Sequence, residues 1–199
     1  GGMTEEVLPE ILLDIIHSLS FPKSMRWAYY QTRFARPVRW LLALYGQQTV
    51  NVQIENVVSG NSSYGHRFLA PDNFVVNSIE EYFAQLRQRY VIVDHRERKN
   101  LIWEQVQETA RQAGGKAMEN DELLEEVCFL LEYPTAFVGR FSPSYLDVPA
   151  EVLTTSMIEH QRYFPVFDDR GRLMNAFIGV RNGTEASLDI VRAGNERVL

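Results

Sequence analysis

The sequence predicts an α+β protein with a mostly antiparallel mixed sheet and helices packed against it. Amphipathic helices and short strands are interspersed along the 199 residues without the regular strand–helix–strand rhythm of a parallel sheet. Residues 163–180 have the pattern of a β-hairpin, with two apolar strands around the turn sequence DDRG. Hydrophobic residues make up 45% of the chain and charged residues 23%, which allows a sizeable core.

The first half of the chain predicts one helix followed by short strands. Residues 4–19 carry an apolar stripe at helical spacing behind Thr4, which we expect as the N-cap. The apolar run at 38–45 ends before Gly46 and predicts a buried strand. Alternation at 50–54 predicts a half-buried strand. The turn sequence SGNSSYG then precedes an expected short strand, HRFLA, at 66–70.

The middle of the chain predicts three helices and one strand. Serine, aspartate and glycine residues mark helix ends, because the first two accept hydrogen bonds from free amide groups and glycine adopts the left-handed conformation. These signals predict helices at 78–89, 95–113 and 121–132, with a short strand, YVIV, at 90–93.

The last part predicts a strand, a helix, a hairpin and the start of another helix. The expected ranges are 135–141 for the strand, 149–161 for the helix, 163–168 with 173–180 for the hairpin, and 188–199 for the final helix. We expect Met157, Tyr163 and Phe164 to pack the helix onto the hairpin, and Glu159, His160 and Arg162 to make polar contacts.

We expect three regions: an N-terminal helix at 1–22, an α+β domain at 23–182 and a helical start at 183–199. The sequence VRAGNERVL stops within a helical pattern, which predicts a fragment of a longer protein, and Gly1-Gly2 resembles a cloning remnant. No run of about 18 apolar residues or basic leader is visible, so we expect no membrane contact. The single cysteine, Cys128, fits a reducing cytoplasm.

Arginine dominates the basic residues of a chain whose net charge is −6. The chain has 17 arginines and three lysines, and several arginines lie in clusters beside aromatic residues. Two interpretations stay open: pairing with the 26 acidic residues, or local patches that contact phosphate. The clusters are Arg33, Arg36 and Arg39; His66 and Arg67; Arg87 and Arg89; Arg96 and Arg98.

No residue pattern indicates catalysis or metal binding. The four histidines are far apart in sequence, and none belongs to a metal-binding motif. Cys128 lies in an apolar helix without a basic neighbour, so its thiol is expected to be inert. Ser156 and His160 are one helical turn apart but lack the glycine-rich loop that would stabilise an oxyanion.

Seven ordered motifs resemble the N-terminal half of the bacterial glycyl-tRNA synthetase β subunit, over residues 8–199. The motifs are FPKSMRW, RFARPVRWLLALYG, SGNSSYGHRF, VIVDHRERKNLI, LLEEVCFLLEYP, VPAEVLTTSMIEHQRYFPV and VRAGNERVL. In that family this region is similar to the B3/B4-type domain of the phenylalanyl-tRNA synthetase β chain. The resemblance therefore implies a B3/B4-like fold in a cytoplasmic aminoacyl-tRNA synthetase.

The resemblance also implies partners and a division of labour. The family is an α2β2 ligase that charges tRNA(Gly) with glycine. ATP, with magnesium, is used by its α subunit, so we expect no cofactor in this chain. The expected partners are tRNA(Gly), the α subunit and a second β subunit.

Three roles remain open for this chain: tRNA binding, a scaffold that docks the α subunit, and a relic editing domain that hydrolyses mischarged tRNA. Editing is disfavoured, because a second sieve accepts smaller products and no amino acid is smaller than glycine. For tRNA binding, phosphate contacts and base stacking require exposed cations and aromatic rings. The candidate RNA contacts are Arg33, Arg36, Arg39, Tyr64, His66, Arg67, His160, Arg162 and Tyr163.

Overall fold

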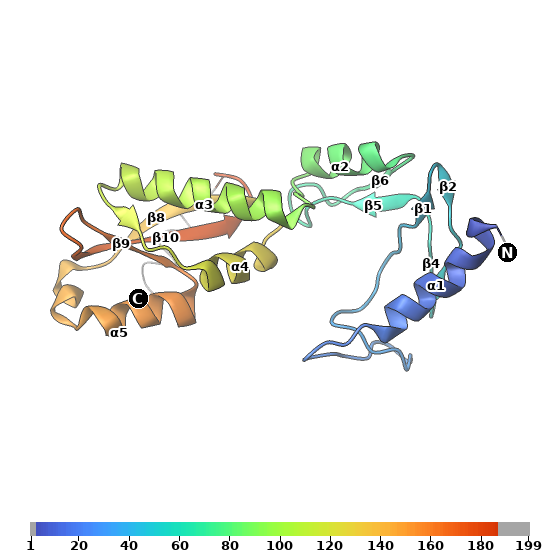
Figure 1. Ribbon diagram of the computed structural model, residues 1–199, viewed down its shortest axis with the longest axis horizontal. Coiled ribbons are helices and arrows are strands. Elements are labelled where there is room, and N and C mark those ends of the chain that lie inside the picture. The colour runs from blue at the N-terminus through green and yellow to red at the C-terminus, as the bar shows by residue number, and fades with distance from the viewer. Residues whose placement is uncertain (1–2, 187–199) are drawn as a thin grey trace. The chain divides into compact units, whose positions relative to one another are not determined.

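The computed structural model describes residues 3–186 and confirms an α+β protein with antiparallel sheets (Figure 1). Its contacts divide the chain into two compact units, residues 1–89 (unit 1) and 90–199 (unit 2). This boundary lies inside the 23–182 region that the sequence analysis treats as one domain. The helix expected at 188–199 lies outside the described residues.

Unit 1 begins with helix α1, Thr4–Ser18, close to the expected range. The helix starts one residue earlier than an N-cap at Thr4 would place it: Met3 occupies the cap position, and its amide donates to the Glu6 carboxylate at 3.2 Å. The residues of the apolar stripe differ in their exposure. Leu8 and Leu12 are half-buried, whereas Ile11 stays exposed.

Short antiparallel hairpins make up the rest of unit 1, followed by helix α2. The hairpin strands are β1 (Leu44–Tyr45) with β2 (Gln48–Thr49), β3 (Gln53–Ile54) with β4 (Val57–Val58), and β5 (Ser62–Tyr64) with β6 (Asn73–Val75). Helix α2 spans Ile79–Gln88, and the hydroxyl of Ser78 accepts from the Glu81 amide as the sequence predicts. At 50–54 the alternating burial is as predicted, since Val50, Val52 and Ile54 are all buried, but the strand is shorter than expected and includes only Gln53–Ile54.

Two other strands expected in unit 1 also differ from the structure. The long strand at 38–45 is reduced to β1 and an isolated bridge between Leu42 and Gly60. The prediction of a strand at 66–70 is wrong, because these residues form a turn. In this turn Nδ1 of His66 accepts the amides of Phe68 and Leu69 at 3.2 and 3.3 Å, and its carbonyl accepts the Ala70 amide at 2.9 Å.

Unit 2 is a four-stranded antiparallel sheet in the order β7-β9-β10-β8, with helices α3 and α4 packed against it (Figure 1). The strands are β7 (Lys116–Ala117), β9 (Phe164–Phe167), β10 (Leu173–Asn182) and β8 (Pro134–Arg140); the helices are α3 (His95–Gln112) and α4 (Asp121–Leu130). The predicted hairpin is β9–β10. Ile102, Val106 and Phe164 are among the fully buried residues that join the helices to the sheet.

The segment between β8 and β9 departs from the single helix expected at 149–161. A 3₁₀ turn, η1 (Pro143–Asp147), precedes α5 (Ala150–Thr155), and the chain then widens into a π-helical segment, η2 (Ser156–Gln161). Arg162 ends this segment in the left-handed conformation, with φ 58°.

The prediction of a strand at 90–93 is also wrong. Ile92 is buried and its amide bonds the Glu132 carbonyl at 2.9 Å, but no strand forms. The guanidinium of Arg98 instead donates hydrogen bonds to the carbonyls of Ile92 and Val93.

Candidate functional site

Positive charge is concentrated in one segment of unit 1. Residues 20–71 contain six basic residues and one acidic residue, a net charge of +5, whereas the rest of the chain carries a net charge of −11. The same segment contains nine of the chain's aromatic residues. An acidic chain with such a segment can attract a polyanion locally. We call residues 20–71 the basic segment.

Three arginines of the basic segment are available to an external anion. Arg36, Arg39 and Arg67 are exposed, and within residues 3–186 none of them forms an ion pair. The one carboxylate of the segment, Glu55, already accepts the amide and the hydroxyl of Thr32. Internal pairing therefore does not account for these arginines.

Arg33 has a different role from its neighbours. Its guanidinium donates to the hydroxyl and the carbonyl of Ser24, each at 3.0 Å. These bonds reinforce the bridge between Met25 and Phe34. Arg33 is exposed, but part of its hydrogen-bonding capacity holds the local backbone.

The turn at 66–70 places an exposed cation and an exposed aromatic ring over a buried histidine. His66 is only 2% exposed, so its ring supports the turn from within. Arg67 and Phe68 are exposed, and the guanidinium lies 5.9 Å from the ring centroid. Tyr64 is exposed and packs on Trp40 with ring centroids 4.7 Å apart. Within this group, Tyr64 and Arg67 have accessible surface for RNA.

The remaining predicted site residues lie in unit 2 and serve mainly its packing. Arg162 bonds Glu126 at 2.7 Å and the carbonyl of Glu159. Tyr163 stacks on Phe177 with centroids 4.2 Å apart and is buried, so its ring presents no exposed face to a base. Burial raises the pKa of the Tyr163 hydroxyl. His160 alone of these residues is exposed and makes no hydrogen bond to a described residue.

The described residues contain no metal cluster and no assembled nucleophile. No group of three or more His, Cys, Asp or Glu side chains among residues 3–186 could hold a metal ion. The Cys128 thiol is buried and directed to the His95 carbonyl at 3.3 Å. A cavity of about 270 Å³ includes Arg162 and Tyr163 in its lining but not His160. In the same part of the chain, no helix is both long and apolar enough to cross a membrane.

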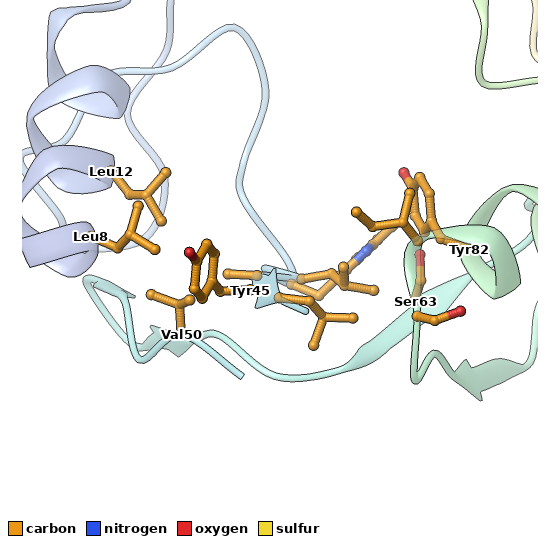
Figure 2. A pocket seen from close by; sticks show the side chains of 12 residues that line it. Leu8, Leu12, Tyr45, Val50, Ser63 and Tyr82 are labelled. Atoms are coloured by element: carbon orange, nitrogen blue, oxygen red, sulfur yellow. The ribbon is translucent and has the colours of Figure 1, made fainter. Parts of the chain in front are cut away.

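Unit 1 also holds an open groove of about 590 Å³ that the sequence did not reveal (Figure 2). Figure 2 shows Leu8 and Leu12 of α1 near Tyr45 and Val50, with Tyr82 of α2 at the other end of the groove. The lining is mostly apolar and contains no charged residue. It consists of Leu8, Leu12, Trp40, Leu42, Ala43, Leu44, Tyr45, Val50, Ser63, Ser78, Ile79 and Tyr82.

One sequence signal could have identified the basic segment, whereas the groove has none of its own. Counting charge over windows, instead of over the whole chain, reveals the basic segment. The run WLLALY at 40–45 indicated a buried strand, although Trp40 and Tyr45 remain 44% and 47% exposed. Large rings left this exposed within an apolar run mark a surface that can receive a ligand.

Comparison with known proteins identifies the family. The family model described as "Glycyl-tRNA synthetase beta subunit" matches residues 1–199. The chain is 67% identical to the glycine--tRNA ligase beta subunit of Syntrophomonas wolfei, and 50% identical to those of Moorella thermoacetica and Desulforamulus reducens. All of the chain is aligned in each case, and it spans 29% of the length of each relative. The chain therefore belongs to the glycyl-tRNA synthetase β subunit family.

Proposed function

We propose that this chain is a tRNA-binding part of a glycyl-tRNA synthetase β subunit, and that the basic segment is its RNA contact. The exposed, unpaired Arg36, Arg39 and Arg67 carry this proposal. Family membership supplies the polyanion, since the relatives are named as tRNA ligases. Phosphate contacts from these arginines would position the RNA without reading its sequence.

The proposal assigns catalysis to other parts of the enzyme. The chain would support ATP-dependent charging of tRNA(Gly) in the cytoplasm, in an assembly with an α subunit and a second β subunit. The α subunit would use ATP and magnesium. Support comes from the family, because the matching model and the relatives are named as the beta subunit of the ligase.

A salt titration of tRNA affinity tests the proposal. In the full-length β subunit assembled with its α subunit, Arg36, Arg39 and Arg67 would be changed together to Gln. Each lost phosphate contact removes about 0.9 from the slope of log affinity against log salt, so three contacts would remove roughly 2.7. The affinity of the triple variant for tRNA near physiological salt should also fall.

A matched control is available in unit 2. Arg96 and Arg170 are also exposed, and neither forms an ion pair with a described residue. Changing both to Gln should leave the salt slope unaltered. If the triple variant kept the affinity and slope of the parent enzyme, the basic segment would not be the RNA contact.

A scaffold role is the second candidate, and unit 2 favours it. Two of its arginines serve internal contacts: Arg162 pairs with Glu126, and Arg98 donates to backbone carbonyls within the unit. Unit 2 would then support docking of the α subunit while unit 1 contacts RNA. Loss of α from the assembly after changes in unit 2, with the tRNA salt slope intact, would support this division.

The editing alternative has less support. His66 is buried and His160 lies outside the lining of the neighbouring cavity, so neither is placed as a base beside a pocket. Hydrolysis of alanyl-tRNA by the assembled enzyme, abolished by His160→Ala, would revive it.

A further inference from the structure

We propose that the groove of unit 1 binds a nucleobase that is unstacked from a single-stranded part of the RNA. This inference rests on the proposed RNA contact of the basic segment. That segment supplies seven of the 12 residues that line the groove. Most of the groove lining and the exposed arginines therefore belong to one stretch of chain.

The lining of the groove selects against charged ligands. None of its 12 residues is charged. A phosphate or a carboxylate placed there would lose water without gaining a cation. The volume of about 590 Å³ lies within the range of small-ligand sites, about 300–1,000 Å³. A neutral, flat group of modest size fits this environment.

The aromatic residues of the groove offer flat rings for the face of a base and hydrogen-bond donors for its polar edge. Trp40, Tyr45 and Tyr82 supply flat apolar rings, on which any base can stack. The indole N–H of Trp40 and the hydroxyl of Tyr82 form no hydrogen bond with a described residue. Burial raises the pKa of the Tyr82 hydroxyl, so it stays protonated and can donate to a base edge.

The chain connects the groove to the exposed cations. Arg39 directly precedes Trp40, and Arg67 follows Tyr64, whose ring packs on Trp40, by three residues. Phosphates held by these arginines would bring the attached base to the groove. The edge of a base offers ring-nitrogen and carbonyl acceptors to the indole N–H and the Tyr82 hydroxyl, which an aliphatic side chain does not, and this favours a base as the occupant.

The test combines variants of the groove with modified tRNA. The full-length β subunit with its α subunit would carry Trp40→Ala or Tyr82→Phe. The RNA probes would be tRNA(Gly) and a set of tRNA(Gly) molecules, each with one abasic site at an unpaired position. We expect Trp40→Ala to weaken tRNA binding roughly tenfold with an unchanged salt slope, because stacking involves no counterion release.

One abasic tRNA should reproduce this loss with the parent enzyme and show no further loss with Trp40→Ala. Tyr82→Phe keeps the ring and should cause a smaller loss, so it tests the groove even if Trp40→Ala fails to fold. Tyr145→Ala is the control, because this residue of unit 2 has an exposure of 47%, close to that of Trp40. Its tRNA affinity should equal that of the parent.

The outcomes separate this inference from the proposed function. If the groove variants and all abasic tRNAs bind normally while the triple arginine variant binds weakly, the groove inference is overturned and the RNA contact stands. If the arginine variant also binds normally, both fail. If Trp40→Ala instead reduces subunit assembly, measured by mass photometry, and the assembled enzyme keeps its tRNA affinity, the groove holds protein and not a base.

Discussion

Two glycines of the unit 2 sheet are required by the phenylalanines opposite them. In the β8–β10 register Gly139 faces Phe177, and Gly179 faces Phe137. A Cβ atom added at either glycine would overlap the ring across the strand pair. Each ring therefore lies over a backbone without a side chain, which places both phenylalanines in the core.

We predict that Gly139→Ala destabilises unit 2 by about 1–3 kcal/mol, the usual cost of overpacking a core. Urea denaturation followed by near-UV circular dichroism would measure the change. Phe177→Leu should relieve part of the cost in the double variant, because the smaller side chain makes room. Gly60→Ala serves as a control, since its nearest neighbour would be 4.0 Å away. If the effects of Gly139→Ala and Phe177→Leu on stability were additive, the two residues would not be in the close contact that this prediction assumes.

His66 shows why residue type alone does not assign a contact. The sequence HRF suggested that the histidine and the arginine both face RNA, but the ring of His66 is buried and organises the turn. Because Nδ1 accepts two amides, the proton is carried by Nε2, which has no partner among the described residues. The neighbouring Arg67 stays exposed. Burial, which depends on distant residues, separates the two roles.

At the scale of elements, Arg98 joins three parts of unit 2. It is 8% exposed and bonds the carbonyls of Ile92, Val93 and Cys128, the last at 2.9 Å. Cys128 lies in the last turn of α4, where free carbonyls favour a cation. The guanidinium therefore connects the start of α3, the segment before it and the end of α4.

We predict that Arg98→Met lowers the free energy of unfolding by about 3 kcal/mol, because buried carbonyls lose charge-assisted bonds. Arg98→Lys should recover little, since an ammonium group lacks the planar fork that reaches separate acceptors. Chemical denaturation measures both variants. Arg111→Met is the control: among the described residues Arg111 pairs with exposed Glu108 alone, and its loss should change stability little. Equal effects of Arg98→Met and Arg111→Met would refute the role of Arg98.

Elements with local signals were predictable, and those fixed by distant contacts were not. Caps predicted α2 and α3, because Ser78 and Asp94 accept the first amides of these helices with their own side chains, and apolar periodicity predicted α4 and the β9–β10 hairpin. The segment at 90–93 has the apolar pattern of a strand, but the carbonyls of Ile92 and Val93 accept hydrogen bonds from Arg98 instead of from a neighbouring strand. The π-helical η2 also has no pattern of its own in sequence.

At the scale of the whole molecule, charge separates two kinds of arginine. Sequence analysis selected the arginines of the candidate site but could not decide between pairing and exposure, because the acidic residues that pair with them are distant in sequence. Arg162 meets Glu126, 36 residues away, whereas Arg36 and Arg39 have no such partner in the described chain. The groove could not be predicted either, since α1, the 40–50 segment and α2 all contribute to it.

Hydrogen exchange on the assembled enzyme offers a test at this scale. We predict that tRNA(Gly) slows amide exchange within residues 20–71, above all in the turn at 66–70, because bound RNA excludes water from exposed backbone. The exposed segment 143–155 of unit 2 should show no change. Mass spectrometry with and without tRNA compares both regions in one experiment. Protection at 156–162 and none at 20–71 would move the RNA contact from Arg36, Arg39 and Arg67 to His160 and its neighbours in unit 2.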